Sequence, residues 1–239
     1  MLTTETWANL ALLCICYGYV LAVIFATSKI EKRLSPNSSR KFLHIMIGNL
    51  PFLIPFFSYN AFPLNFPFFV AAPFIFITFL STPYSPIKSL SKKMAGLTEV
   101  TEGGHHLGLM FYAVSYTILA SLFSTKPYII AAGIFPMAYG DAAASLVGQR
   151  FGKTKYRVFA QKSLEGSIAM FAVSFGVFAM SLFFFSALYP VSLSLSVMAA
   201  LGVAFAAAIA EALTPRGFDN ITVPLLSALV FLLFVGGSV

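Results

Sequence analysis

Charged residues are scarce in this chain: only 10% of its 239 residues are Asp, Glu, Lys or Arg, and only eight of these are acidic. Hydrophobic residues make up 59% of the chain, and its mean hydropathy is +0.87. A water-soluble domain of this size does not need so much apolar surface, whereas a protein that crosses a membrane several times does. The composition therefore disfavours a soluble enzyme and predicts an all-α polytopic integral membrane protein.

Cysteine is also nearly absent, with only Cys14 and Cys16 in the whole chain. The two lie two residues apart in the first apolar segment, so they project from different sides of a helix and cannot readily form a disulfide. We interpret them as small apolar residues that say nothing about the redox compartment. Basic residues are missing before the first apolar segment, and we therefore expect no cleaved signal peptide.

Long apolar segments are what the sequence has instead, and a helix that crosses a bilayer needs roughly 20 such residues. Eight candidates are spread evenly along the chain, which predicts one transmembrane domain over residues 1–239. The second and third are rich in Pro and Phe and could be distorted or re-entrant, which would leave seven crossings. The eight segments cover residues 7–28, 41–58, 63–81, 106–124, 128–147, 164–186, 191–213 and 220–237.

The few charges fall on one side of this arrangement. If all eight segments cross, 14 of the 15 basic residues lie in alternate loops, and only Lys126 lies opposite. Basic loops of membrane proteins face the cytoplasm, so both termini are expected outside. The net charge of +7 thus reflects topology and not nucleic-acid binding. Seven of the eight acids share the basic side, which predicts an active site that faces the cytoplasm.

Residues 83–104 form the second of these basic loops. Ile87, Leu90, Met94 and Leu97 have helical spacing, while three lysines mark another face. This pattern predicts a short amphipathic helix at the membrane interface. A plain connecting loop with a solvated basic face is the alternative.

Polar residues are densest between Tyr139 and Gly166. Asp141 ends an apolar segment, a basic loop with spaced glycines follows over residues 148–163, and Glu165 begins the next segment. Ionisable groups beside a bilayer are costly, so they mark a functional site by default. The glycines would leave N–H groups open to an anion, and the lysines would meet phosphates. Helix packing through small residues and capping by Ser163 are the structural alternatives.

Three further clusters carry polar chemistry. Arg40, Lys41 and His44 can share one helical face and suit a phosphate or a lipid head group. Glu211 and Asp219, with Asn220, bracket a turn that contains Pro and Gly and suits magnesium. Residue Glu102 lies beside His105 and His106 in a weaker cluster without metalloprotease spacing.

Two similar motifs do not fit. Residues 148–154 lack one residue between the glycines of a P-loop, and no strand is predicted before them. Tyr139-Gly140-Asp141 is similar to the signature of intramembrane aspartyl proteases, but Ala138 stands where a glycine is needed. The second aspartate of such a protease would have to be Asp219, which does not follow a tyrosine.

The polar blocks, taken together and in this order, resemble the CTP-dependent polyprenol kinase family, which includes dolichol kinase and phytol kinase. The resemblance runs from Arg40 to Pro224, and the length is similar to that of short prokaryotic members. Its most specific part is the Gly-Asp and Lys-Ser-x-Glu-Gly pair. The matching pieces are RKFLH with Gly48, Glu102 with Gly108 and Tyr112, GDAAASLVGQRFG, KSLEG, and Glu211 to Asn220 with Pro224.

The resemblance implies transfer of the γ-phosphoryl group of CTP to an isoprenoid alcohol, such as phytol, geranylgeraniol, farnesol or a dolichol-type polyprenol. It implies Mg²⁺ as cofactor, and it is compatible with an oligomer. A cytidylyltransferase that makes a CDP-lipid and a transporter of an anionic solute are the alternatives. The expected catalytic and metal-binding residues are Asp141, Glu165 and Asp219; the nucleotide-binding residues are Gly140, Gly148, Gly152, Lys153, Lys162, Ser163 and Gly166; the residues for substrate or phosphate are Arg40, Lys41, His44, Glu102, Glu211 and Asn220.

Overall fold

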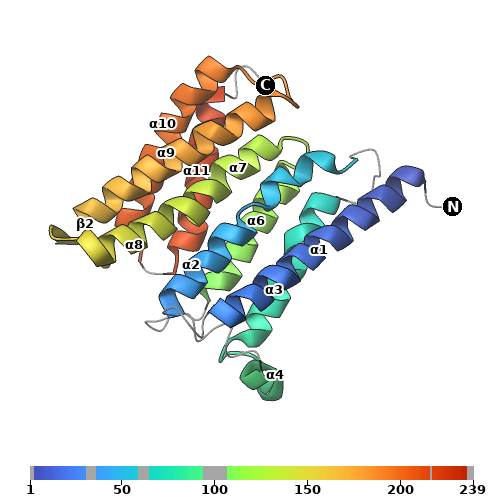
Figure 1. The fold of residues 1–239 in the computed structure, drawn as a ribbon, viewed down its shortest axis with the longest axis horizontal. Helices are drawn as coiled ribbons and strands as arrows, with labels where there is room; N and C mark the ends of the chain where they lie inside the picture. Colours follow the sequence, from blue (N-terminus) through green and yellow to red (C-terminus); the bar gives the residue numbers. More distant parts are fainter. Residues whose placement is uncertain (1–2, 31–35, 59–64, 94–106, 216, 236–239) are drawn as a thin grey trace. The chain divides into compact units, whose positions relative to one another are not determined.

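The computed structural model describes residues 3–30, 36–58, 65–93, 107–215 and 217–235. Nearly all the secondary structure in these ranges is helical, which confirms the all-α class (Figure 1). One two-stranded hairpin is the exception in the described chain. The residues group into two compact units, Met1–Thr125 and Lys126–Val239, and each is described by itself. A single kinase domain stays a prediction.

The N-terminal unit contains the first four predicted segments. The second is distorted, as its prolines suggested: a helix is followed by two short 3₁₀ turns that contain Pro51 and Pro55. Proline has no N–H to donate and its ring clashes with the preceding turn, so the α-helix cannot continue. The elements are α1 (Thr4–Ile30), α2 (Pro36–Ile47), η1 (Leu50–Phe52), η2 (Ile54–Phe56), α3 (Phe66–Ser81), α4 (Lys88–Lys93) and α6 (Gly108–Leu122).

Side-chain hydrogen bonds to main-chain atoms hold α1 against its neighbours. The Tyr19 hydroxyl donates to the Met46 carbonyl in α2, and the Tyr17 hydroxyl donates to the Phe69 carbonyl in α3, both at 2.6 Å. Asn9 exchanges two hydrogen bonds with the main chain of Ser58. These hydrogen bonds satisfy polar groups that the hydrocarbon core of a bilayer could not satisfy.

Helix α4 covers only six residues of the 83–104 loop. The part of the predicted amphipathic helix beyond residue 93 lies outside the described residues, as does Glu102 with its two neighbouring histidines.

The C-terminal unit is a bundle around one continuous helix. Helix α7 (Pro127–Phe135), the π-helical turn η3 (Pro136–Gly140) and α8 (Asp141–Phe151) run together over Pro127–Phe151. Every residue of α7 is buried. Around it pack α9 (Leu164–Ser186), α10 (Leu193–Leu213) and α11 (Asp219–Val235), which follow one another in antiparallel order (Figure 1).

The segment 148–163 is not one loop. Residues 148–151 complete α8, and the rest is built around the strands β1 (Lys155–Arg157) and β2 (Gln161–Ser163). The strands pair antiparallel, with Tyr156 opposite Lys162. Because the apolar run ends at residue 147, hydropathy did not predict that the helix continues for another turn.

Among the residues that the structure describes, four helices are long and apolar enough to cross a membrane: α1, the continuous helix Pro127–Phe151, α9 and the Ser196–Leu213 part of α10. Helices α3, α6 and α11 are apolar but shorter. These features agree with a polytopic membrane protein. Alternation along the C-terminal unit places the end of α8, the start of α9, the end of α10 and the start of α11 at the same end of the bundle.

Candidate functional site

A cluster of charged side chains lies at that end of the C-terminal unit. The Lys162 ammonium, on β2, forms an ion pair with the Glu211 carboxylate near the end of α10. The side chains of these two residues are only 16% and 5% exposed. Asp141 and Asp219 lie within electrostatic reach of Lys162. The fold thus gathers four charged residues from four different segments.

Lys162 is the cation of this cluster. Burial lowers the pKa of Lys162, but Glu211 raises it by charge and hydrogen bonding, and Asp219 and Asp141 raise it further. The net effect places the pKa of Lys162 above its ordinary value, so the side chain is charged at neutral pH. A permanent buried cation suits the binding of phosphate.

Asp141 is the acid that the fold buries within the central helix. It begins α8 directly after the π-helical turn, and it is only 6% exposed. A π-turn inserts one residue into a helix and so rotates the residues that follow. Pro136 opens this turn and lacks the N–H that a regular helix would use. Burial of a carboxylate is costly unless nearby charge or hydrogen bonds compensate it, and the Lys162 ammonium lies within electrostatic reach of Asp141. A catalytic or metal-binding role for Asp141 stays a prediction.

Asp219 and Asn220 begin α11 after a sharp turn. Gly217 has φ of 89°, a conformation that residues with a side chain rarely adopt. The Asn220 main-chain and side-chain N–H groups donate to one Asp219 oxygen at 3.0 and 3.2 Å. Below the turn, the Thr214 and Thr222 hydroxyls are 2.9 Å apart. The turn therefore fixes the Asp219 carboxylate close to Glu211.

The KSLEG block shapes the junction of the hairpin and α9. The Ser163 hydroxyl accepts from the Gly166 N–H at 3.2 Å, which confirms the predicted N-cap. Glu165 accepts the N–H groups of Lys153 and Thr154 at 3.1 and 3.0 Å. Its carboxylate therefore anchors the segment that enters the hairpin. A direct catalytic or metal-binding role for Glu165 stays a prediction.

The glycines of both blocks lie where α8 and α9 cross. A Cβ added at Gly166 would lie 2.9 Å from the Ala144 carbonyl oxygen and 3.4 Å from the Gly148 Cα. One added at Gly140 would lie 2.8 Å from the Met170 sulfur and would overlap the Ser174 hydroxyl. Small residues allow this approach of two helix backbones. Packing thus accounts for these three glycines, and their binding of nucleotide stays a prediction.

Gly152 ends α8 in the same crowded region, beside the Ser163 hydroxyl. The hairpin that follows is basic and mostly exposed: Lys153, Lys155 and Arg157 all face solvent. Lys155 donates to the Gly148 carbonyl at 3.2 Å. The exposed lysines can reach a polyphosphate that approaches this end of the unit.

Magnesium is the cofactor that the resemblance implies, and the charge of the cluster fits it. One lysine does not balance the three carboxylates of Asp141, Glu211 and Asp219. Within the described ranges, no three Asp, Glu, His or Cys residues are grouped closely enough to hold a metal alone. Mg²⁺ commonly takes one or two protein carboxylates and completes its shell with water and substrate phosphates. The cluster supplies that kind of partial set.

A second group of predicted site residues lies in the N-terminal unit, on α2. Lys41 and His44 are buried, at 5% and 2% exposure, and Arg40 precedes them on the helix. The His44 ring stacks on Tyr112 of α6, with centroids 4.9 Å apart and planes 11° from parallel. His44, the most deeply placed of these three residues, therefore contacts α6. In that helix the sequence had singled out only Gly108 and Tyr112.

Known proteins resemble the chain along most of its length. The phytol kinase of Synechocystis sp. is 34% identical over 218 residues, which cover 88% of this chain and 86% of that protein. The chain belongs to the phytol kinase family. Plant members include a probable chloroplastic phytol kinase of Triticum aestivum, 33% identical over 100% of this chain and 80% of its own, and phytol kinase 1 of Arabidopsis thaliana, 28% identical over 92% and 74%. No protein-family model and no solved structure matches the chain.

Membership in the phytol kinase family confirms the resemblance drawn from the sequence blocks. The structure adds contacts that the blocks did not reveal. The pairing of Lys162 with Glu211 joins residues 49 positions apart. In the sequence, only their opposite charges and their predicted location on the same side of the membrane could have suggested this ion pair. The contact of Gly140 with Ser174 had no such signal, because neither residue type is unusual in an apolar helix.

Proposed function

We propose that this protein is a membrane kinase that transfers the γ-phosphoryl group of CTP to the hydroxyl of an isoprenoid alcohol such as phytol. Membership in the phytol kinase family supports the alcohol and the reaction type. The choice of CTP follows from the resemblance of the sequence blocks to CTP-dependent polyprenol kinases. The observation that carries the proposal is the cluster of Lys162 with Asp219 and the buried acids Asp141 and Glu211.

Phosphoryl transfer depends mainly on positioning and on neutralising charge. In this site Asp141 accepts the proton of the alcohol, whose oxygen forms a bond to the γ-phosphorus. The bond from that phosphorus to the bridging oxygen of the β-phosphate breaks, and CDP leaves. Lys162 and Lys153 neutralise phosphate oxygens. Because the Lys162 ammonium has three N–H donors, it can bind a phosphate oxygen while it keeps its ion pair with Glu211.

Bound magnesium would neutralise charge on the phosphates, and Asp219 would hold it while Asp141 acts as the base. Glu165 acts at a distance from the phosphates, through the main chain of Lys153 and Thr154. By fixing this segment it positions the lysines of the hairpin. The predicted distribution of basic loops places this end of the unit toward the cytoplasm, where CTP is dissolved.

The test uses purified protein in lipid nanodiscs with phytol or geranylgeraniol. CTP labelled at the γ-phosphorus should pass its label to the lipid, and CTP labelled at the α-phosphorus should not. Transfer of the α label would indicate a CDP-lipid synthase. Absence of both transfers, with several alcohols and with ATP, GTP and UTP tried as donors, would refute the kinase.

A further inference from the structure

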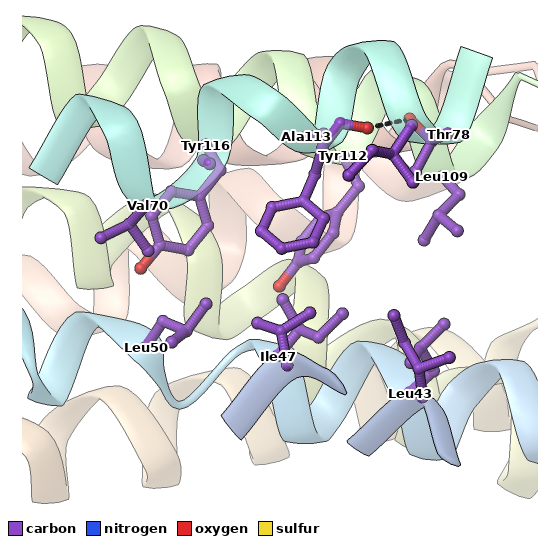
Figure 2. Close-up of a pocket in the computed structure, with 14 residues that line it drawn as sticks. Leu43, Ile47, Leu50, Val70, Thr78, Leu109, Tyr112, Ala113 and Tyr116 are labelled. Atoms are coloured by element: carbon purple, nitrogen blue, oxygen red, sulfur yellow. Dashed lines mark hydrogen bonds between the residues drawn. The ribbon is translucent and has the colours of Figure 1, made fainter. Parts of the chain in front are cut away.

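An apolar pocket lies inside the N-terminal unit. It is lined by α1, α2 with η1, α3 and α6. Its cavity volume is about 50 Å³, several times what one water molecule needs. Figure 2 shows its walls, which include Leu43, Ile47, Leu50, Val70, Tyr112 and Tyr116.

The walls offer a guest almost nothing but hydrocarbon. Thr78 is a polar lining residue, but its hydroxyl donates to the Phe74 carbonyl of its own helix at 2.5 Å (Figure 2). Tyr112 and Tyr116 are only 2% exposed. A polar guest would lose its hydrogen bonds to water in such a pocket, whereas an apolar chain would not. The pocket therefore selects a hydrocarbon.

The two ends of the pocket differ in what lies beside them. Leu43, Thr78 and Leu109 lie toward one end, and Leu50, Val70 and Tyr116 toward the other (Figure 2). Seven helical residues separate Leu109 from Tyr116, so the pocket extends about 10 Å along α6. The first end coincides with the basic part of α2, where His44 follows Leu43 and stacks on the pocket wall at Tyr112.

We infer that this pocket binds a segment of the isoprenoid chain of the alcohol. The inference rests on the proposed function for the choice of an isoprenoid. The apolar walls suit a hydrocarbon chain, and the His44 ring stacked on Tyr112 provides a polar boundary at one end of the pocket. Pocket residues, and not the charged cluster, then set the preference for chain length.

Two neighbouring alanines of α3 provide a matched pair of variants. Ala71 lines the pocket and Ala72 does not. Ala71→Leu should raise the KM for phytol and geranylgeraniol by about tenfold or more, the scale on which a few methylene groups change recognition in an apolar pocket. The KM for CTP should not change. Ala72→Leu should leave both constants within about twofold of the wild type. Equal effects of the two variants on the alcohol would overturn the inference.

A binding measurement covers the case in which Ala71→Leu does not fold. A geranylgeraniol analogue with a photoreactive diazirine on its chain is irradiated with the full-length protein in nanodiscs. Label should attach to peptides that contain Leu43–Leu50 or Leu109–Tyr116, and phytol should compete for it. Label that an excess of fatty alcohol removes equally well would show a general lipid site and overturn the inference.

The two proposals fail in different ways. If the wild type transfers γ-phosphate but its label lies only outside the pocket, the chain-binding inference is wrong and the kinase stands. If phytol competes for label in the pocket but no nucleotide donates phosphate, the kinase is wrong and the pocket stands.

Discussion

The crossing of α8 and α9 allows a stringent test of the site's architecture through the substitution Gly166→Ala. The new methyl group would lie 2.9 Å from the Ala144 carbonyl oxygen, 3.0 Å from the Ser163 hydroxyl and 3.4 Å from the Gly148 Cα. Two of these three neighbours are main-chain atoms, which cannot rotate away. The helices must therefore move apart, and with them the N-cap of α9.

The expected cost follows from overpacking, which destabilises by about 1–3 kcal/mol. Gly176 provides the control, because it lies on the same helix and a Cβ there meets nothing within 4 Å. Gly176→Ala should not lower the free energy of unfolding, and it can raise it by up to about 1 kcal/mol because alanine has a higher helix propensity than glycine. For a chain of this size each kcal/mol moves Tm by about 2–4 °C, so Gly166→Ala should lower Tm by about 2–12 °C.

Thermal unfolding is followed by intrinsic fluorescence in one detergent at one heating rate, because membrane proteins often unfold irreversibly. The same preparations are assayed for the KM of CTP, which should rise in Gly166→Ala as the hairpin shifts. If Gly166→Ala is as stable as Gly176→Ala and binds CTP as the wild type does, the close crossing does not support the site.

Four further substitutions test the charged cluster and Glu165, which anchors the segment that enters the hairpin. Asp141→Asn should lower kcat by about 10²–10⁴-fold, the range for loss of a general base, while Tm holds; near-normal turnover would refute its role. Lys162→Met should destabilise by about 3–5 kcal/mol because it leaves Glu211 buried without its cation, and adding Glu211→Leu should restore much of this, as a double-mutant cycle in Tm would show. The pKa of Lys162 lies above its ordinary 10.5, so the ion pair's contribution to the free energy of unfolding is complete below that pH. It is lost only as the pH rises through the raised pKa. A loss of stability between pH 7 and 9 would argue against the ion pair. Glu165→Gln should raise the KM for CTP more than it lowers kcat, whereas an equal loss in both kcat and kcat/KM would indicate direct catalysis.

Much of the helical framework could be predicted because hydrophobic length is a local property. The predicted segment 164–186 coincides with α9, and the prolines of 41–58 marked the break after α2. The N-cap at Ser163 was predictable for the same reason, since a cap depends on residues within one turn. The end of α8 was missed because its last turn is polar, and hydropathy does not detect a polar helical turn.

The candidate site was predictable only as a set of residue types. The sequence singled out Asp141, Lys162, Glu211 and Asp219, but it suggested that Lys162 binds phosphate and left its partner Glu211 unidentified. It left both anion binding and helix packing open for the glycines, and the structure places three of them at a helix crossing. Spacing within one segment cannot distinguish these roles, because the atoms that decide between them belong to other helices.

The sequence by itself determined that the chain consists of apolar helices, because hydropathy acts residue by residue. Only the tertiary structure decided that Lys162 meets Glu211 beside two aspartates, and that α1, α2, α3 and α6 leave an apolar pocket. Both features depend on distances between helices that the sequence separates. Those distances are set by close packing of side chains, for which no single segment contains the information.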